Sequence, residues 1–214
     1  MSEITHPCPL CGHATRPFHS DGRRDYRRCA TCGLVHVPRA QQLDPTAEKA
    51  EYDLHRNDPA DPGYRAFLSR AAEAVQARVA PPAHGLDFGC GPGPALPAML
   101  EEAGYTVALY DKYYAAHPGA LQQTYDFVTA TEVFEHLGAP DNVLRRLLGC
   151  LRPGGWLVIM TKRVRHREAF AQWHYIHDPT HVAFFGEETF RWIADRHGLR
   201  LDIVGDDVVA LQRP

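Results

Sequence analysis

Four of the six cysteines form two Cys-x2-Cys pairs, Cys8 with Cys11 and Cys29 with Cys32, and 17 residues separate the pairs. Two pairs of thiolates with this spacing are typical of a tetrahedral zinc site, and the glycine soon after each pair permits a tight backbone turn. A redox dithiol is the alternative, but no strand-helix-strand pattern surrounds either pair. We therefore expect these four cysteines to bind a structural Zn²⁺ ion.

A second candidate site is the segment 86–93, Leu-Asp-Phe-Gly-Cys-Gly-Pro-Gly, which follows a predicted strand. Its three alternate glycines permit the backbone to approach a ligand closely, although Pro94 fits the dinucleotide pattern G-x-G-x-x-G poorly. Asp111 stands 20 residues after Gly91, at the end of the next predicted strand. A carboxylate at that place can accept both ribose hydroxyls, so the two motifs fit an adenosyl ligand.

Titratable side chains gather in two later segments. Glu132, Glu135 and His136 are spaced i, i+3 and i+4, which places them on one face of a helical turn. The segment 173–185 holds three histidines, His174, His177 and His181, and several aromatic residues. Histidine moves protons near neutral pH, so His136, His174 and His181 are our catalytic candidates. Aromatic packing around a plain turn, or a second metal on the three histidines, are the alternatives for 173–185.

A parallel sheet is the element that would position these residues. Short apolar strands at 85–89, 105–110, 126–130 and 155–161 alternate with helical patterns at 64–80, 94–103, 141–151 and 187–197. This alternation predicts an α/β fold with a doubly wound, mainly parallel sheet, and strands 199–204 and 208–212 add a C-terminal antiparallel hairpin. We expect a small zinc ribbon over 1–40, a linker over 41–63 with a short helix near 47–52, and the α/β domain over 64–214.

The composition is that of an ordinary globular protein. The chain has 214 residues, 44% hydrophobic and 23% charged, which excludes disorder and a coiled coil. The net charge of −3 speaks against a surface devoted wholly to nucleic acid, yet residues 1–40 carry a local +3 from six arginines. The ribbon is thus either a nucleic-acid-facing module or a solvated hairpin. With no apolar run of about 20 residues and no secretory signal pattern, we expect a cytoplasmic protein without a membrane partner.

Taken together and in order, these motifs resemble those of the class I S-adenosylmethionine-dependent methyltransferases. The segments 125–137 and 148–159 look like the fourth strand of that family and the turn into its fifth, and the resemblance covers about residues 64–214. It implies a cofactor site at the strand ends, formed by Asp87, Gly89, Cys90 and Gly91 around the methionine end, Asp111 at the ribose, Lys112 or Tyr113 beside the adenine, and Glu132 closing the pocket.

One departure from the family concerns the third strand. Only 14 residues separate Asp111 from Asp126, where the family usually fits a helix, a strand and an acidic contact to the adenine amino group. Either the third strand is rudimentary, or Gln122 and Gln123 replace that contact.

The spacing of Glu132, Glu135 and His136 also resembles the E-x-x-E-H motif of quinone-precursor O-methyltransferases. That resemblance implies a divalent cation such as Mg²⁺, which orients the acceptor oxygen. In the competing interpretation Glu132 touches the cofactor and the other two residues cap the next helix. We expect a methyltransferase acting on a small molecule; an RNA methyltransferase docked by the ribbon, a non-catalytic adenosyl-ligand-binding protein and a nicotinamide oxidoreductase are the alternatives.

Overall fold

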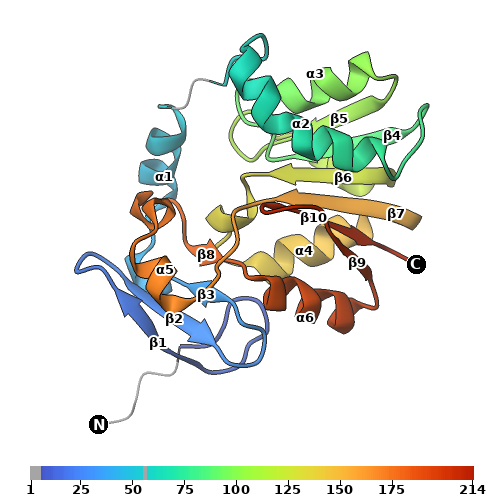
Figure 1. Cartoon of the computed structure of the whole chain (residues 1–214). Helices are drawn as coiled ribbons and strands as arrows, with labels where there is room; N and C mark the ends of the chain where they lie inside the picture. The colour runs from blue at the N-terminus through green and yellow to red at the C-terminus, as the bar shows by residue number, and fades with distance from the viewer. Residues whose placement is uncertain (1–5, 55–56) are drawn as a thin grey trace.

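The computed structural model describes residues 6–54 and 57–214, which fold into two sheets (Figure 1). The larger sheet has six strands in the order β5-β4-β6-β7-β10-β9, and the first four run parallel while β10 is antiparallel to both its neighbours. This confirms the predicted mainly parallel α/β sheet with a C-terminal hairpin. The strands are β4 (His84–Phe88), β5 (Thr106–Tyr110), β6 (Tyr125–Thr131), β7 (Leu151–Met160), β9 (Arg200–Ile203) and β10 (Val208–Gln212).

Helices cover both faces of this sheet, as Figure 1 shows. On one face, α2 (Pro62–Gln76) and α3 (Ala95–Glu102) pack on Phe127 and Val158. On the other, α4 (Pro140–Gly149) and α6 (Glu187–His197) pack on side chains such as Val128. Successive strand residues point to opposite faces, so strands buried on both sides read as continuous apolar runs. Within the described residues, no helix is both long and apolar enough to cross a membrane.

The connector between the ribbon and the sheet contains α1 (Pro45–Tyr52), close to the short helix expected there. Asp44 caps it by accepting the backbone N–H groups of Thr46 and Ala47, and Asp61 caps α2 in the same way. Proline suits the first helical position because its missing N–H would have no intrahelical partner. Asp44-Pro45 and Asp61-Pro62 are therefore helix starts, and α2 begins and ends a few residues earlier than the predicted 64–80.

The edge of the sheet beyond β5 lacks a third strand. The residues between β5 and β6 are all described, and they hold a 3-10 helix, η2 (Pro118–Gln122), instead. A regular third strand is thus absent between β5 and β6, which is compatible with both alternatives, and the contact expected from Gln122 and Gln123 stays a prediction. The chain returns to β6 directly, and Leu121 of η2 lines the cavity described below.

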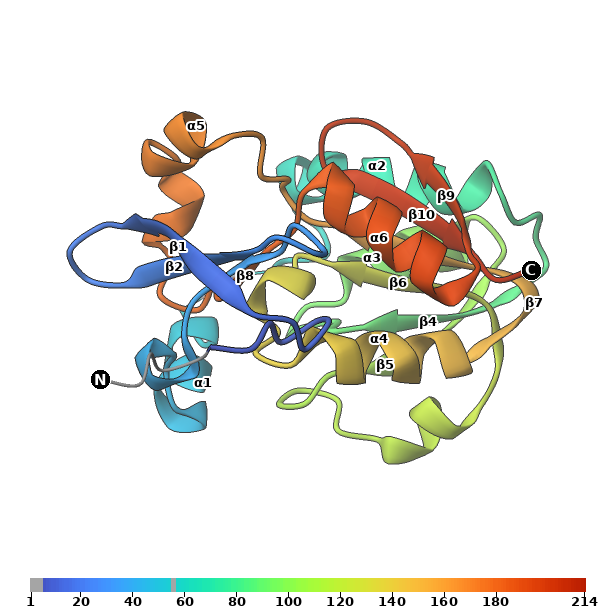
Figure 2. The same cartoon turned by 90° about the horizontal axis from the view of Figure 1, so that it is seen from below.

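The ribbon forms the second, four-stranded sheet, and its last strand comes from the distant α/β part. The order is β1 (Thr15–Ser20), β2 (Asp25–Cys29), β3 (Val35–His36) and β8 (Ala183–Phe184), all antiparallel. Figure 2 shows the ribbon beside α5 (Arg167–Ala171). A buried aromatic cluster of Tyr26, Phe170 and Phe184 joins the two parts. The sequence pattern did not predict this pairing.

Candidate functional site

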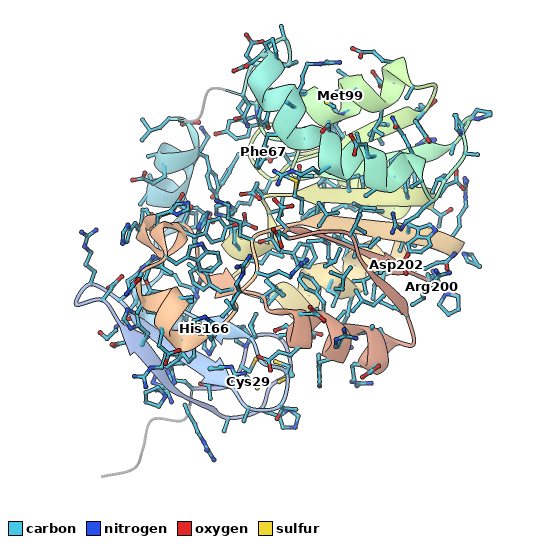
Figure 3. The ribbon with its side chains drawn as sticks, in the orientation of Figure 1. Cys29, Phe67, Met99, His166, Arg200 and Asp202 are labelled. Carbon is cyan, nitrogen blue, oxygen red and sulfur yellow. The ribbon has the colours of Figure 1, made fainter. Side chains whose placement is uncertain are left out.

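A cavity of about 630 Å³ opens where the carboxyl ends of β4, β5 and β6 meet. In an open parallel sheet, ligands bind at the place where the strand order reverses, as it does around β4. Residues of α1, α2 and α4 close the sides of the cavity, and Phe67, labelled in Figure 3, contributes from α2. All predicted cofactor residues except Tyr113, the alternative to Lys112, line this cavity together with His136 and His181: Asp87, Gly89, Cys90, Gly91, Asp111, Lys112 and Glu132.

The glycine turn needs its glycines for both conformation and space. Gly89 and Gly91 have φ angles of +79° and +63°, which side chains disfavour. A Cβ atom on Gly89 would lie 2.4 Å from Val133 Cγ2, and one on Gly93 would lie 1.6 Å from the carbonyl oxygen of Asn57. The backbone N–H of Gly89 donates to the Tyr110 carbonyl at 2.7 Å, which fixes the turn against β5.

Asp111 ends β5 and organises the loop around it. One carboxylate oxygen accepts the backbone N–H of Gly91 at 3.2 Å, and the other accepts those of Tyr113 and Tyr114 at 2.7 and 3.1 Å. The carboxylate therefore ties the glycine turn to the end of β5 while it also lines the cavity. Its position matches the acidic residue that binds ribose hydroxyls in such folds.

Asp87 lies inside the sheet, at the base of the cavity. Only 3% of the residue is exposed, and the Thr129 hydroxyl donates to one carboxylate oxygen at 2.6 Å. Burial raises the pKa of Asp87 to about 6 because removal from water disfavours the charged form, and the Thr129 hydrogen bond opposes that shift. A cation bound in the cavity would favour the ionised carboxylate.

Glu132 has the signs of a functional residue. It has a φ of +52°, the only positive value for a non-glycine residue among those described. Such a conformation is costly and concentrates at ligand sites. Its Oε1 atom is buried without a hydrogen-bond partner in the described part of the chain, and burial, reinforced by the nearby Glu135, raises the pKa of Glu132 to about 8. A ligand with a positive charge or an N–H group would fit this carboxyl.

Two of the three predicted histidines meet in the cavity. The rings of His136 and His181 have centroids 4.8 Å apart, although 45 positions separate them in the chain. His136 Nδ1 lies 3.3 Å from the Thr180 carbonyl, and His181 Nδ1 lies 2.7 Å from that of Tyr175. A carbonyl can only accept, so these contacts favour a proton on each Nδ1 and a basic Nε2.

The structure places Lys112 in the cavity lining and His174 outside it. His174 stands in η4 (His174–His177), outside the cavity lining, with its Nε2 3.3 Å from Lys162 Nζ. Its predicted catalytic role therefore has no support from its position. The Lys112 side chain lines the cavity, but its ammonium binds Glu48 of α1 at 2.5 Å.

Glu135 is completely buried behind the two histidines, in η3 (Phe134–His136). Its carboxylate accepts the hydroxyl groups of Tyr175 at 2.5 Å and Thr161 at 2.8 Å. Atoms of Glu135, His136 and His181 that can bind a metal lie within 4.8 Å of one another. The three residues that lie close enough to hold a metal ion are therefore Glu135, His136 and His181. Glu132, which belongs to the predicted E-x-x-E-H motif, is not among them.

Sequence reasoning missed several cavity residues from outside the strand ends. Tyr52 of α1 packs on His136 with ring centroids 5.2 Å apart, and Asn57, Tyr64 and Asp178 also line the cavity. No local motif marks these residues, because tertiary packing alone brings them to the site. The apolar periodicity of α2 was the one signal available, and it identified the helix without identifying Tyr64.

The four predicted zinc ligands also converge. Their sulfur atoms lie within 4.8 Å of one another, with Cys8 and Cys32 at 3.5 Å and Cys11 and Cys29 at 3.4 Å. The amides of Gly12 and Gly33 donate to the carbonyls of Cys8 and Cys29, which builds the two tight turns. Figure 3 labels Cys29 in the ribbon. Four thiolates about 2.3 Å from a common centre are what tetrahedral zinc requires, so this donor set fits the ion.

The sheet is mainly parallel and ends in an antiparallel hairpin, a glycine turn follows its first strand, and a carboxylate follows its second. This combination defines the Rossmann-like methyltransferase class. The family model described as a methyltransferase domain matches residues 59–203. The chain therefore belongs to the methyltransferase domain family, a family of enzymes.

Two curated relatives and one solved structure illustrate the likeness. The ubiquinone biosynthesis O-methyltransferase of Serratia proteamaculans is 34% identical over 77 residues, 36% of this chain and 32% of that protein. Its namesake from Pectobacterium atrosepticum is 29% identical over 126 residues, 50% of this chain and 51% of that protein. The chain thus spans between a third and a half of the length of these relatives.

The solved structure shows that the fold is shared. It is the 1,6-didemethyltoxoflavin-N1-methyltransferase of Burkholderia thailandensis with bound 1,6-didemethyltoxoflavin and S-adenosylhomocysteine. The TM-score is 0.53 at 16% identity, and the match covers 92% of this chain and 99% of the other. The similarity therefore extends over nearly the whole chain at the level of the fold.

Proposed function

We propose that the protein transfers a methyl group from S-adenosylmethionine to a small-molecule acceptor. The observation that carries this proposal is the convergence of Asp87, Asp111 and Glu132 on one cavity at the ends of three neighbouring strands. Asp111 would accept the ribose hydroxyls, and Asp87 and Glu132 would face the positively charged methionine end. The unpartnered Oε1 of Glu132 supports this fit. The cofactor supplies an electrophilic methyl group on its sulfonium.

His136 and His181 are suited to remove the proton of the acceptor. Burial lowers the pKa of His181, which favours its neutral imidazole. A neutral imidazole with its Nδ1 proton held by a carbonyl presents Nε2 as a base. We assign His136 as the general base and His181 as its neighbour in the acceptor wall. The acceptor's oxygen or nitrogen would bond to the methyl carbon as the S–CH3 bond breaks and its electron pair stays on sulfur, and the His136 imidazole would take the acceptor's proton.

A divalent cation on Glu135, His136 and His181 is the second candidate for activating the acceptor. The spacing of their potential ligand atoms favours it, and a cation would lower the acceptor's pKa. Against it, both oxygens of Glu135 already accept hydroxyl groups, so this buried carboxylate is satisfied without an ion. We therefore prefer proton transfer to His136. Chelation that leaves the cysteine site loaded, followed by a turnover assay, decides between the two mechanisms.

The acceptor we propose is a small, unsaturated ring compound with an ionisable hydroxyl or N–H group. Tyr52 and Tyr64 give the cavity aromatic walls, and its volume of about 630 Å³ leaves limited room beside a cofactor. Relatives named for ubiquinone biosynthesis and for 1,6-didemethyltoxoflavin support a ring acceptor.

RNA is the less favoured acceptor. Four of the six ribbon arginines are engaged within the chain: Arg27 with Thr15, Arg28 with Glu188, Arg39 with Gln42, and Arg24 with the loop discussed below. The Arg24 guanidinium, which donates to four carbonyls, is not available to a phosphate backbone. Part of the positive charge of the ribbon is therefore used in intramolecular contacts.

Zinc on Cys8, Cys11, Cys29 and Cys32 remains our proposal for the ribbon, with a structural role. The division into a ribbon over 1–40, a linker over 41–63 and an α/β domain over 64–214 stays a prediction, and so does the cytoplasmic location.

A thermal-shift experiment tests the proposed function. S-adenosylhomocysteine at about 100 times its dissociation constant should stabilise the protein by about 2.7 kcal/mol, since a ligand that binds only the folded state raises its stability. NAD at the same concentration should have no effect. Methyl transfer from methyl-labelled S-adenosylmethionine to a panel of phenols, quinols and ring N–H compounds then identifies the acceptor. A shift with NAD and none with S-adenosylhomocysteine would refute the proposal.

A further inference from the structure

Arg24, in the turn between β1 and β2, reaches from the ribbon into the wall of the cavity. Its Nη1 atom donates to the carbonyl oxygens of Pro179 at 2.9 Å and His181 at 3.0 Å. Its Nη2 atom donates to those of Ile176 at 2.5 Å and Asp178 at 2.9 Å. Four carbonyls of one short loop therefore converge on one guanidinium. Because its donors lie in a rigid plane, a guanidinium also fixes how these carbonyls are oriented.

The ribbon holds Arg24 in place for these contacts. Asp21 accepts the backbone N–H groups of Arg23 and Arg24, both at 2.8 Å. The hydroxyl of the buried Tyr26 donates to Asp21 at 2.8 Å and has the Ile176 carbonyl as a second, longer acceptor at 3.2 Å. The Arg24 guanidinium lies 5.6 Å from the centre of the Tyr26 ring. The turn, the aromatic ring and the guanidinium thus form one unit against the loop.

The loop that Arg24 holds carries part of the candidate site. Asp178 and His181 line the cavity, and Asp178 Oδ2 lies 3.7 Å from His181 Nε2. The Thr180 carbonyl lies 3.3 Å from His136 Nδ1, and the Tyr175 carbonyl just before the loop lies 2.7 Å from His181 Nδ1. Backbone atoms in and beside the loop therefore orient both imidazoles, so a shift of the loop would move them together.

We propose that Arg24 is a positioning residue, through which the ribbon holds the loop 176–181 and thereby sets His181 and Asp178 against His136. The pairing of β3 with β8, just after the loop, and the bond from Val37 N–H to the Val182 carbonyl at 2.9 Å support the same loop from its other end. The proposal rests on the proposed function for the reaction that this arrangement serves. The ribbon then acts as a scaffold of the acceptor side of the cavity.

Hydrogen exchange in the full chain tests this directly, with Arg24→Ala, Arg24→Lys and, as a control, Arg23→Ala. Arg23 is the exposed neighbour in the same turn. The amides of His181 and Val182 donate to the Asp178 and Glu135 carbonyls, so their exchange reports on the loop. Both Arg24 variants should accelerate that exchange by about tenfold or more, the size expected for lost hydrogen bonds to a charged group. Arg23→Ala should leave it unchanged.

The second set of readouts separates positioning from a general loss of structure. Metal content and exchange in β1 and β2 should match the wild type, and affinity for S-adenosylhomocysteine should stay within about twofold, because Arg24 lies outside the cofactor end. The ¹⁵N chemical shifts of the His136 and His181 imidazoles should change. If Arg24→Ala unfolds the ribbon, Arg24→Lys, which keeps the charge without the planar fork, decides the question.

Two results would overturn the proposal. One is unchanged exchange at residues 176–182 and unchanged imidazole signals in the Arg24 variants with an intact ribbon. The other is full restoration of wild-type exchange by lysine, which would show that the charge alone suffices. A wild-type protein that fails to bind S-adenosylhomocysteine would contradict the proposed function instead, and the exchange result would still test Arg24.

Discussion

Asp111 combines two roles in one carboxylate, since it accepts three backbone N–H groups and also lines the cavity. Asp111→Ala should weaken binding of S-adenosylhomocysteine by about 1.5 to 3 kcal/mol, the range for hydrogen bonds to a charged group. It should also lower the free energy of unfolding, because the three amides lose their acceptor. Asp111→Asn, which keeps one acceptor oxygen, should lower both the affinity and the free energy of unfolding by less. Calorimetry and thermal unfolding measure the two effects, and unchanged affinity in the alanine variant would place the ribose elsewhere.

The raised pKa of Glu132 predicts that cofactor binding releases a proton. In the empty cavity its pKa of about 8 keeps it protonated at pH 7, and a bound cation would favour the carboxylate and lower that pKa. Binding at pH 7 should therefore release up to about one proton, and affinity should rise with pH, by at most about tenfold per unit, until Glu132 ionises unaided near pH 8. Calorimetry in buffers of different ionisation enthalpy counts the protons.

The control for this prediction is Glu132→Gln, in which the release should disappear. In the protein without cofactor, folding stability depends on pH in the opposite direction to cofactor affinity. The folded-state pKa lies above the usual 4.5, so Glu132 contributes stability at low pH that is lost as the pH rises from about 4.5 to about 8. Equal proton release in the wild type and the glutamine variant would exclude Glu132 as the source.

The histidines provide a matched pair of variants. His136 lies in the cavity, while His174, from the same set of predicted candidates, lies outside it. Once an acceptor is known, His136→Ala should lower kcat by about 10² to 10⁴, the usual contribution of a general base, with cofactor affinity nearly unchanged. His174→Ala should keep wild-type turnover. Similar losses in both variants would contradict the assignment of His136.

At the scale of elements, the ribbon and the loop before β8 should respond together to loss of the metal. Cys29→Ser should release zinc, because structural zinc sites supply on the order of 10 kcal/mol to the folding of small modules. Cys8, Cys29 and Cys32 share a core cluster with Phe190 of α6, and β3 pairs with β8. Hydrogen exchange should therefore increase over 6–36 and also over 176–184, while the remaining sheet stays protected.

The matched control for the ribbon is Cys150→Ser, which changes a buried cysteine that is not one of the four proposed zinc ligands. It should keep one zinc ion per chain by metal analysis. Wild-type protein purified without chelators and found to contain no zinc would contradict the zinc proposal. Increased exchange confined to 6–36 would show that the ribbon does not support the loop.

Elements with strong local signals could be predicted from the sequence, and those that depend on distant contacts could not. The helix at 187–197 and the strand at 208–212 agree with α6 and β10, because α6 ends at Gly198 with a φ of +64° and its apolar face is continuous. By contrast, β8 contains only two residues and exists through its pairing with β3. An Asp-Pro pair is typical of both turns and helix starts, so the predicted starts of α1 and α2 fall two residues after the observed ones.

At the scale of the whole molecule, one part of the candidate site has local sequence signals and the other depends on contacts between distant parts of the chain. The proposed cofactor end lies at the ends of strands β4, β5 and β6, where the family resemblance pointed to Asp87, Asp111 and Glu132. The acceptor end is assembled from three distant parts of the chain: Tyr52 in the connector, His136 after β6, and His181 in the loop that the ribbon holds. Only the three-dimensional packing reveals that Arg24, 157 positions before His181, belongs to this arrangement.

The central claim is that S-adenosylmethionine binds in this cavity with its sulfonium directed toward His136 and His181. A crystal structure of the protein with S-adenosylhomocysteine tests it most directly. The account predicts electron density for the ribose hydroxyls at Asp111, for the amino group near Asp87 and Glu132, and for the sulfur on the side of the cavity that His136 lines. Density for the ligand at another surface, or with the ribose away from Asp111, would contradict the account.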